Sequence, residues 1–156
     1  MDATKVDTAK YLAVNELEAK GAWIRYFKFV CAIWGAFCIV AGVYYAIEYI
    51  TSPLTFVLLG NAVLSVLQAI VYGLQAKAIQ NVDFDLQKNL VRFFYFNTIA
   101  APCWVTLGPL ISLGMPQIFA GLGTFVFCGV MLIFSFQVKR VFENKKAFVL
   151  TAEDCA

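Results

Sequence analysis

Four long apolar stretches dominate the pattern of hydrophobic and polar positions along the chain. They cover residues 29–47, 54–76, 93–113 and 118–138. A membrane-spanning helix needs about 20 predominantly apolar residues, because each residue adds about 1.5 Å to a crossing of about 30 Å. Each stretch reaches or approaches that length, so the pattern predicts four transmembrane helices.

Two of the links between these stretches are very short. They comprise residues 48–53 and 114–117, and links of this length force the helices that they join into antiparallel hairpins. The segment 77–92 is longer and polar, and we expect it to form a cytosolic loop between the hairpins. The predicted fold class is all-α: an integral membrane four-helix bundle of two antiparallel hairpins, with N and C termini cytosolic.

All 12 basic residues flank the apolar stretches on one side of this pattern. They are Lys5, Lys10, Lys20, Arg25 and Lys28 before the first stretch, Lys77, Lys88 and Arg92 between the second and third, and Lys139, Arg140, Lys145 and Lys146 after the fourth. Basic flanks resist translocation across a membrane. We therefore expect a cytosolic segment at 1–28, a transmembrane domain at 29–138 and a cytosolic tail at 139–156.

A short helix is predicted at 8–20, before the first span. The segment has helical composition and is followed by Gly21, a suitable residue just beyond a helix C-terminus. The helix would lie near the membrane surface, with Tyr11, Val14 and Leu17 against lipid. A partner-binding helix and a solvated helix are equally open interpretations.

Composition supports a membrane protein. The chain is 62% hydrophobic and 14% charged, with a mean hydropathy of +0.77, which exceeds what a soluble domain of this length could bury. No apolar signal segment precedes the first span, so we expect that span to target the chain. The net charge of +2 is spread over three segments, which gives no support to nucleic-acid binding.

The residues indicate no catalytic, cofactor or metal site. The chain has five cysteines without a CxxC spacing and no histidine, which argues against zinc or haem. No catalytic triad, phosphate loop or pair of intramembrane carboxylates is present. We therefore expect a non-enzymatic protein without a cofactor, with room for a bound lipid. Cys31, close to Lys28 at the membrane boundary, is a candidate palmitoylation site, and Cys155 is a second candidate.

Small residues form stripes on the first and fourth spans. The stripes consist of Cys31, Gly35, Cys38, Gly42 and Ala46 on the first span, and of Gly121, Thr124, Cys128 and Ser135 on the fourth. Close backbone approach across small residues holds membrane helices together. The stripes are therefore predicted helix-packing seams that make these two spans core helices, packed on each other, although one seam could instead form an oligomer interface.

The second span carries a polar face. Asn61, Ser65, Gln68, Tyr72 and Gln75 follow helical spacing, and amides turned toward lipid would leave unpaired donors and acceptors. We expect hydrogen bonds to other helices, with a hydrated pathway as the alternative. No span has a charged residue at its centre, which argues against ion conduction.

The third span contains two prolines. Pro102 and Pro109 each delete an amide donor and are predicted to kink the helix, with Asn97 and Thr98 about one turn before the first proline. The kinks favour a packing adjustment over a gate.

Four stretches in the second half of the chain combine with the hairpin spacing into a recognisable layout: Phe93-Phe94-Tyr95-Phe96-Asn97, Gly108-Pro109-Leu110-Ile111-Ser112, Ile118-Phe119-Ala120-Gly121 and Phe125-Val126-Phe127. This layout resembles the COPI-associated membrane proteins of Golgi vesicles and, more distantly, the Flower family. The chain departs from these families at Gln75, where they tend to place a glutamate, and at Ala100-Ala101-Pro102, where many COPI-associated members have a Gly-Arg pair. A calcium-conducting role is therefore not carried over.

The resemblance implies a four-pass protein of Golgi or vesicle membranes, more than of the plasma membrane, that organises membrane or assists vesicle traffic. Its partners would be membrane lipids and other membrane proteins or cytosolic trafficking proteins. Self-association and membership of a hetero-complex both remain open. The alternatives are an accessory structural subunit of a larger membrane complex and an oligomeric channel or transporter.

Overall fold

The structure is a computed structural model that describes residues 3–19, 22–51, 56–113 and 116–154. Side chains are described at 7–16, 19, 24–51, 56–111 and 116–145. The described residues form five helices: α1 (Ala3–Ala19), α2 (Ala22–Thr51), α3 (Phe56–Asn81), α4 (Phe84–Leu113) and α5 (Ile118–Asp154).

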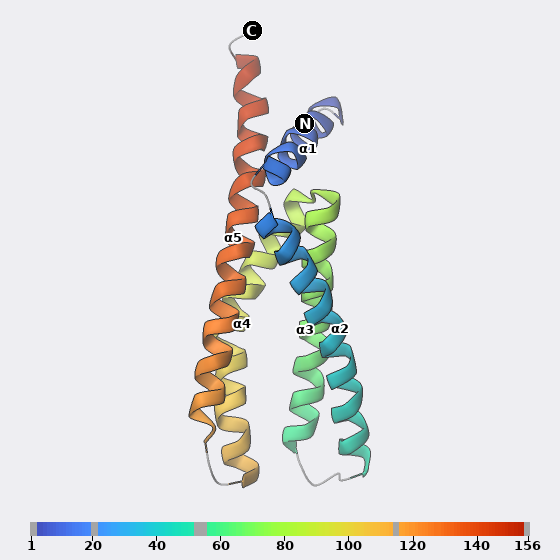
Figure 1. Cartoon of the computed structure of the whole chain (residues 1–156), viewed down its shortest axis with the longest axis vertical. Helices are drawn as coiled ribbons and strands as arrows, with labels where there is room; N and C mark the ends of the chain where they lie inside the picture. Colours follow the sequence, from blue (N-terminus) through green and yellow to red (C-terminus); the bar gives the residue numbers. More distant parts are fainter. Residues whose placement is uncertain (1–2, 20–21, 52–55, 114–115, 155–156) are drawn as a thin grey trace.

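Four of these helices are long and apolar enough to cross a membrane. The candidate spans are Ile24–Thr51, Phe56–Asn81, Phe84–Ile111 and Ile118–Lys145. Helix α2 packs along α3 and α4 packs along α5, so the chain forms two antiparallel hairpins (Figure 1). A helix satisfies its own backbone hydrogen bonds, which a hydrocarbon environment requires. The predicted all-α, four-helix membrane fold is confirmed.

The connection between the hairpins is much tighter than the sequence suggested. Only Val82 and Asp83 interrupt the helices within 77–92, the segment that was expected to be a loop. Val82 has a φ of 49°, and the amide of Asp83 donates to the carbonyl of Ala78 at 3.0 Å, which closes the end of α3. Asp83 Oδ1 then accepts from the amide of Leu86 at 3.0 Å and caps the start of α4. Hydropathy marks where lipid ends, whereas these caps mark where the helices end.

Helix α1 packs against α5 of the same chain. Ala9 and Ala13 are fully buried, and Glu16 forms an ion pair with Lys145 of α5 at 2.7 Å. This contact is possible because α5 stays helical to Asp154, through most of the segment that was expected to be a tail. The two helices together form a folded unit beyond the hydrophobic span.

Tyr11 and Val14 of α1 are exposed, so the predicted contact of this helix with lipid stays a prediction. Tyr11 is 67% exposed and Val14 is 37% exposed, on the side of α1 that does not pack on α5. The side chain of Leu17 lies outside the described residues, as does Gly21. The small alanines, not the larger apolar residues, therefore make the contact that positions α1.

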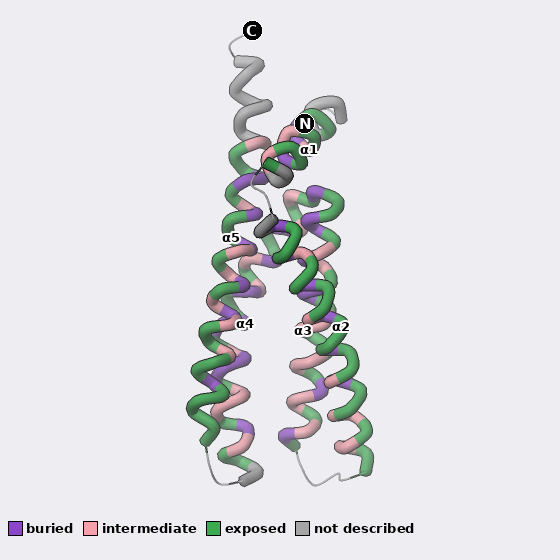
Figure 2. Tube along the Cα trace, viewed as in Figure 1, coloured by how far each residue is buried: buried purple, intermediate pink, exposed green. Residues whose placement is uncertain are grey.

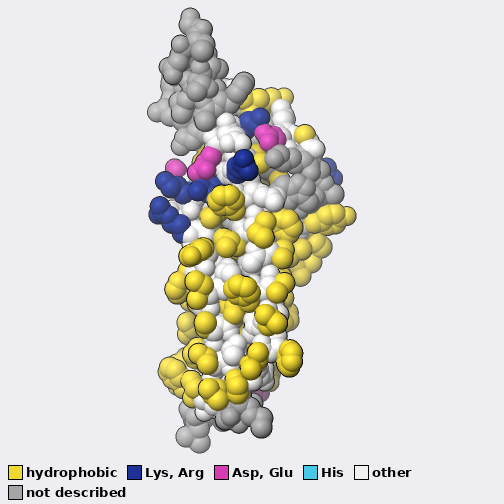
Figure 3. All heavy atoms as spheres, turned by 90° about the vertical axis from the view of Figure 1, so that its left-hand side faces the viewer, with side chains coloured by type: hydrophobic (Ala, Val, Ile, Leu, Met, Phe, Trp, Pro, Cys, Tyr) yellow, Lys and Arg dark blue, Asp and Glu magenta, His cyan; other side chains and the backbone are white. Residues whose placement is uncertain are grey.

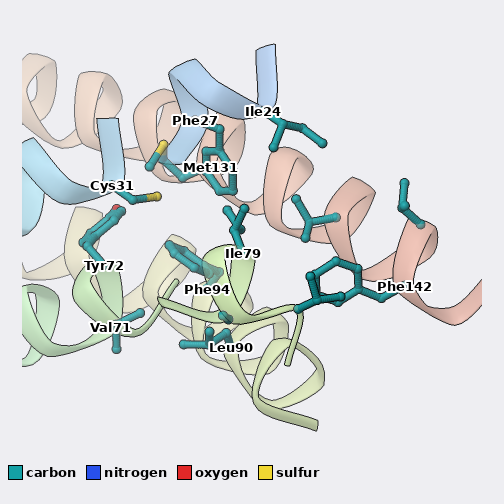
Figure 4. Packing of buried hydrophobic residues seen from close by; sticks show 14 of the residues in the cluster. Ile24, Phe27, Cys31, Val71, Tyr72, Ile79, Leu90, Phe94, Met131 and Phe142 are labelled. Carbon is teal, nitrogen blue, oxygen red and sulfur yellow. The ribbon is translucent and has the colours of Figure 1, made fainter. Parts of the chain in front are cut away.

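A hydrophobic cluster joins the two hairpins near the end that carries both termini (Figure 4). Phe27 of α2 lies against Phe134 of α5, with ring centroids 5.4 Å apart. Tyr72 of α3 meets Phe94 of α4 edge-on, also at 5.4 Å. Edge-to-face pairs add to the stabilisation gained from burying aromatic area. The hairpins are thus held together mainly at one end.

The outer surface matches a lipid environment. Exposed residues lie on the outer faces of the helices, whereas buried residues face the neighbouring helices (Figure 2). On the face shown in Figure 3, hydrophobic side chains cover the long part of the molecule, and Lys and Arg gather toward the end with the termini. Both termini and the α3–α4 turn lie at that same end (Figure 1), as an even number of crossings demands. The cytosolic orientation of this end remains a prediction from the charge pattern.

Candidate functional site

A closed ring of hydrogen bonds links three helices inside the bundle. Gln75 Nε2 on α3 donates to Gln87 Oε1 on α4 at 2.7 Å. Gln87 Nε2 donates to the carbonyl oxygen and to Oγ of Ser135 on α5, at 2.9 Å and 3.0 Å. Ser135 Oγ donates back to Gln75 Oε1 at 2.8 Å. All three residues are fully buried, so the ring fixes the relative positions of the two hairpins.

Sequence reasoning identified only part of this ring. Gln75 was expected on a polar face and Ser135 on a small-residue stripe, but Gln87 fell in the expected loop. The signal that could have found Gln87 is Asp83, a helix-capping residue type. A helix that begins directly after Asp83 includes Gln87 and brings it beside Gln75 of α3.

A cavity of about 210 Å³ lies between the hairpins, and Tyr72 belongs both to its lining and to the hydrophobic cluster. Its polar lining comprises Trp34, Cys38, Tyr45, Asn61, Ser65, Gln68, Tyr72 and Thr124. No charged residue lines it. Four of the five residues predicted as the polar face, Asn61, Ser65, Gln68 and Tyr72, thus line this interior space, while Gln75 belongs to the separate hydrogen-bonded ring.

Two side-chain hydrogen bonds join different helices at residues that line the cavity. Trp104 Nε1 of α4 donates to Asn61 Oδ1 of α3 at 2.7 Å, which ties one hairpin to the other. The thiol of Cys38 on α2 donates to Gln68 Oε1 on α3, with 3.6 Å between sulfur and oxygen. These contacts are the interhelical hydrogen bonds that the polar face predicted, and both are made within one chain.

Two polar groups beside the cavity have no protein partner among the described residues. Trp34 Nε1 and Tyr72 Oη are buried atoms without a hydrogen bond. Tyr72 is 1% exposed and its ring reaches toward α2 near Cys31 (Figure 4). A buried donor without a partner costs about 1–3 kcal/mol. The site therefore favours water or an uncharged ligand that offers an acceptor oxygen.

The seam on α2 faces its own hairpin partner. A Cβ atom added to Gly35 would lie 3.5 Å from the carbonyl oxygen of Ala69, and one added to Gly42 would lie 3.4 Å from a methyl group of Val66. Both neighbours belong to α3. Cys31 and Cys38 of the same seam are buried. The small residues thus let α2 and α3 approach closely.

The seam on α5 faces α4 in the same way. A Cβ added to Gly121 would collide with Thr106 Oγ1 and lie 3.3 Å from the carbonyl oxygen of Pro102. The sulfur of Cys128 accepts from Asn97 Nδ2 at 3.6 Å. Thr124 is only half-buried and donates to the carbonyl of Ala120 at 2.8 Å.

The expectation that the two seams pack on each other is therefore wrong. Helices α2 and α5 meet through large aromatic side chains instead, including Trp34 and Phe127, whose ring centroids are 4.7 Å apart. The reason is geometric: each hairpin holds its two helices side by side, and their small residues lie in that contact. Aromatic rings of α2 and α5 occupy part of the space between the hairpins.

Cys31 is an unsuitable acceptor for palmitate in this conformation. Its side chain is 0% exposed and lies in the hydrophobic cluster next to Tyr72 (Figure 4). An acyltransferase could reach the sulfur only if the hairpins separated. The second candidate, Cys155, lies outside the described residues.

The prolines of α4 do not interrupt the helix. Pro102 is buried and Pro109 is half-buried within a helix that runs from Phe84 to Leu113. Thr98 donates through Oγ1 to the carbonyl of Phe94 at 2.8 Å, in the turn before Pro102. The predicted kinks stay a prediction.

Comparisons with protein families, curated proteins and solved structures give no match to this chain. The fold and the site therefore define its class: a multi-pass, all-α integral membrane protein. Within the described residues, no group of three or more His, Cys, Asp or Glu side chains is placed to hold a metal ion.

Proposed function

We propose that the protein is a non-enzymatic four-pass protein of Golgi or vesicle membranes that organises the membrane or assists vesicle traffic through its cytosolic end. The family resemblance supplies the type of membrane. The observation that carries the proposal is the docked helix α1, which the Glu16–Lys145 ion pair and the buried alanines hold on α5.

The docked helix offers a defined surface to a cytosolic protein. Tyr11 and Val14 lie three positions apart on α1 and are both exposed, so they share one outward face. An exposed tyrosine supplies apolar area and a hydroxyl at low cost in side-chain entropy, which suits a binding contact.

The proposal is tested by proximity labelling in cells with a labelling enzyme fused to the N-terminus. We expect the native chain to label Golgi or vesicle proteins, including coat or cargo-receptor components. The paired substitution Tyr11→Ala with Val14→Ser should lose the cytosolic part of that set. Tyr44→Ala, which changes an exposed tyrosine near the opposite end of α2, is the matched control and should keep it.

Two outcomes would contradict the proposal. The native chain could reside in a different organelle, or the labelled set could be the same with and without the Tyr11 and Val14 substitutions. Either result removes the role of the α1 surface in vesicle traffic.

An accessory subunit of a larger membrane complex is the second candidate. Exposed bulky residues form a stripe on α2 that includes Phe29, Ile33 and Phe37, and such a stripe suits a partner helix as well as lipid. A native mass measured after mild solubilisation separates the two functions, since a stoichiometric set of co-purifying proteins would favour the subunit.

The channel alternative gains less support, because Asn61 and Gln68 are paired inside one chain.

A further inference from the structure

A groove between α4 and α5 opens on the outer face of the second hairpin. It has a volume of about 700 Å³. Arg92 and Tyr95 of α4 and Ile133, Phe136 and Arg140 of α5 line it. The groove is mostly apolar along its length and carries two cationic side chains.

Both arginines lie at the same depth relative to the hydrophobic span. Arg92 directly precedes the apolar stretch 93–113, and Arg140 follows the stretch 118–138 by two positions. Antiparallel packing of α4 and α5 brings these two ends together. The guanidinium groups therefore sit at the boundary between headgroups and hydrocarbon, and the apolar part of the groove continues from there into the membrane.

A second, more polar hollow adjoins the groove on the side away from the span. It has a volume of about 380 Å³ and is lined by Gln137, Arg140, Val141 and Asn144. Gln137 and Arg140 belong to both hollows. The two hollows therefore adjoin each other at Gln137 and Arg140, and together they make a path with a polar part and an apolar part.

The charge of this path is positive and uncompensated within the described side chains. No acidic residue lines either hollow. Glu143, which is near in sequence, is held by Lys139 at 3.4 Å. Neither Arg92 nor Arg140 has a hydrogen-bond or ion-pair partner among the described residues.

We propose that this path is a binding site for one anionic phospholipid. Its phosphate lies between Arg92 and Arg140, since a guanidinium donates two parallel hydrogen bonds to phosphate oxygens. The side chains of Gln137 and Asn144 bind the polar headgroup. One acyl chain follows the apolar groove, and the site prefers an anionic over a zwitterionic lipid because no acid is present to pair with a choline or an ammonium group. This inference goes beyond the proposed function, because it concerns a lipid site that would serve in any organelle.

The experiment uses the full chain purified in a mild detergent and counts bound lipids by native mass spectrometry. The probes are phosphatidylglycerol, phosphatidylcholine with the same acyl chains, and glycerol phosphate as the headgroup without chains. We expect one saturable phosphatidylglycerol, weaker binding of phosphatidylcholine and no retention of glycerol phosphate. Each arginine near an anionic membrane surface is worth about 1 kcal/mol, or about fivefold in affinity.

Three substitutions separate the charged and apolar parts of the site. Arg92→Gln with Arg140→Gln should weaken phosphatidylglycerol binding by about 30-fold. Ile133→Trp should also weaken it, by filling the groove without a change of charge. Arg25→Gln removes an exposed arginine from α2 and is the matched control, which should bind like the native chain.

Several results would overturn the proposal. Equal binding of phosphatidylglycerol by the double variant would do so, as would an equal loss in Arg25→Gln, which would mean diffuse attraction to the basic end. Equal affinity for phosphatidylcholine would remove the claim of an anionic ligand. The arginines are exposed, so the variants should fold, and Arg92→Lys with Arg140→Lys, which keeps the charge but not the paired donors, should retain an intermediate affinity.

Discussion

Gln75 on α3 and Gln87 on α4 form a buried amide pair across the Val82–Asp83 turn, with 2.7 Å between Gln75 Nε2 and Gln87 Oε1. The pair exists because the turn is tight and both helices continue up to it. Ser135 extends the contact to α5. A polar ring placed where the hairpins converge makes their relative position specific, which apolar packing alone specifies less well.

Loss of Gln87 should destabilise the fold. Gln87→Leu leaves Gln75 Nε2 without its buried acceptor and removes the donor to the carbonyl and hydroxyl oxygens of Ser135, so we expect a loss of about 1–3 kcal/mol of stability. Each hydrogen bond alone would be worth less, about 0.6 kcal/mol on average in a membrane. Thermal unfolding in detergent measures the change. Lys88→Gln, an exposed neighbour on α4, is the control, and a Gln87→Leu protein as stable as this control would disprove the role of the ring.

Two glycines of α5 should respond oppositely to alanine. Gly121→Ala places a Cβ against Thr106 and the carbonyl of Pro102, whereas a Cβ at Gly123 meets nothing within 4 Å. We expect Gly121→Ala to destabilise the α4–α5 hairpin by about 1–3 kcal/mol. Gly123→Ala should be neutral or stabilising by up to about 1 kcal/mol, because alanine favours a helix. Melting temperatures of the two variants in one detergent decide the matter, and equal shifts would refute the close approach at Gly121.

The sequence was sufficient to predict the four spans and the hairpin pairing. An apolar stretch of sufficient length indicates a span, and a short link between two spans makes them antiparallel neighbours. It also indicated which residues are small and inward. It could not indicate which helix a seam contacts, since a stripe that includes Gly35 or Gly121 allows close approach by any helix. Only the packed structure assigns Gly35 to α3 and Gly121 to α4.

Gln87 shows a second limit of sequence reasoning. Hydropathy separates lipid-facing from water-facing positions, and Gln87 lies among polar residues that look like a loop. Whether such residues continue a helix depends on capping, here at Val82 and Asp83, and on burial between hairpins that are distant in sequence. The sequence therefore indicated Gln75 and Ser135 of the polar ring but not Gln87.

The four described cysteines should differ in reactivity. Cys103 is exposed on α4, whereas Cys31, Cys38 and Cys128 are buried. A small, membrane-permeable maleimide applied to the folded protein in detergent should modify Cys103 first and leave the other three until the protein unfolds. Peptide mass spectrometry locates the label. Rapid modification of Cys31 would show that its sulfur is accessible and would restore it as a palmitoylation candidate.

Tyr72 tests whether the cavity between the hairpins is occupied. Its hydroxyl is buried and has no protein partner among the described residues, in a space large enough for several waters and lined by Ser65, Gln68 and Asn61. Because an unsatisfied hydroxyl is costly, we expect a water or an uncharged ligand in the cavity to accept its hydrogen bond. Tyr72→Phe should then lower stability by about 0.5–1.5 kcal/mol.

The comparison with Asn61 makes this measurement decisive. Asn61→Leu leaves the indole N–H of Trp104 without its acceptor, so it should cost about 1–3 kcal/mol whether the cavity is wet or dry. If thermal unfolding shows Asn61→Leu destabilised and Tyr72→Phe equal to or more stable than the native chain, then nothing bonds the hydroxyl and the cavity is dry. Destabilisation of both variants means that the polar face of α3 holds a bound molecule, because the tyrosine hydroxyl has no other described partner to lose.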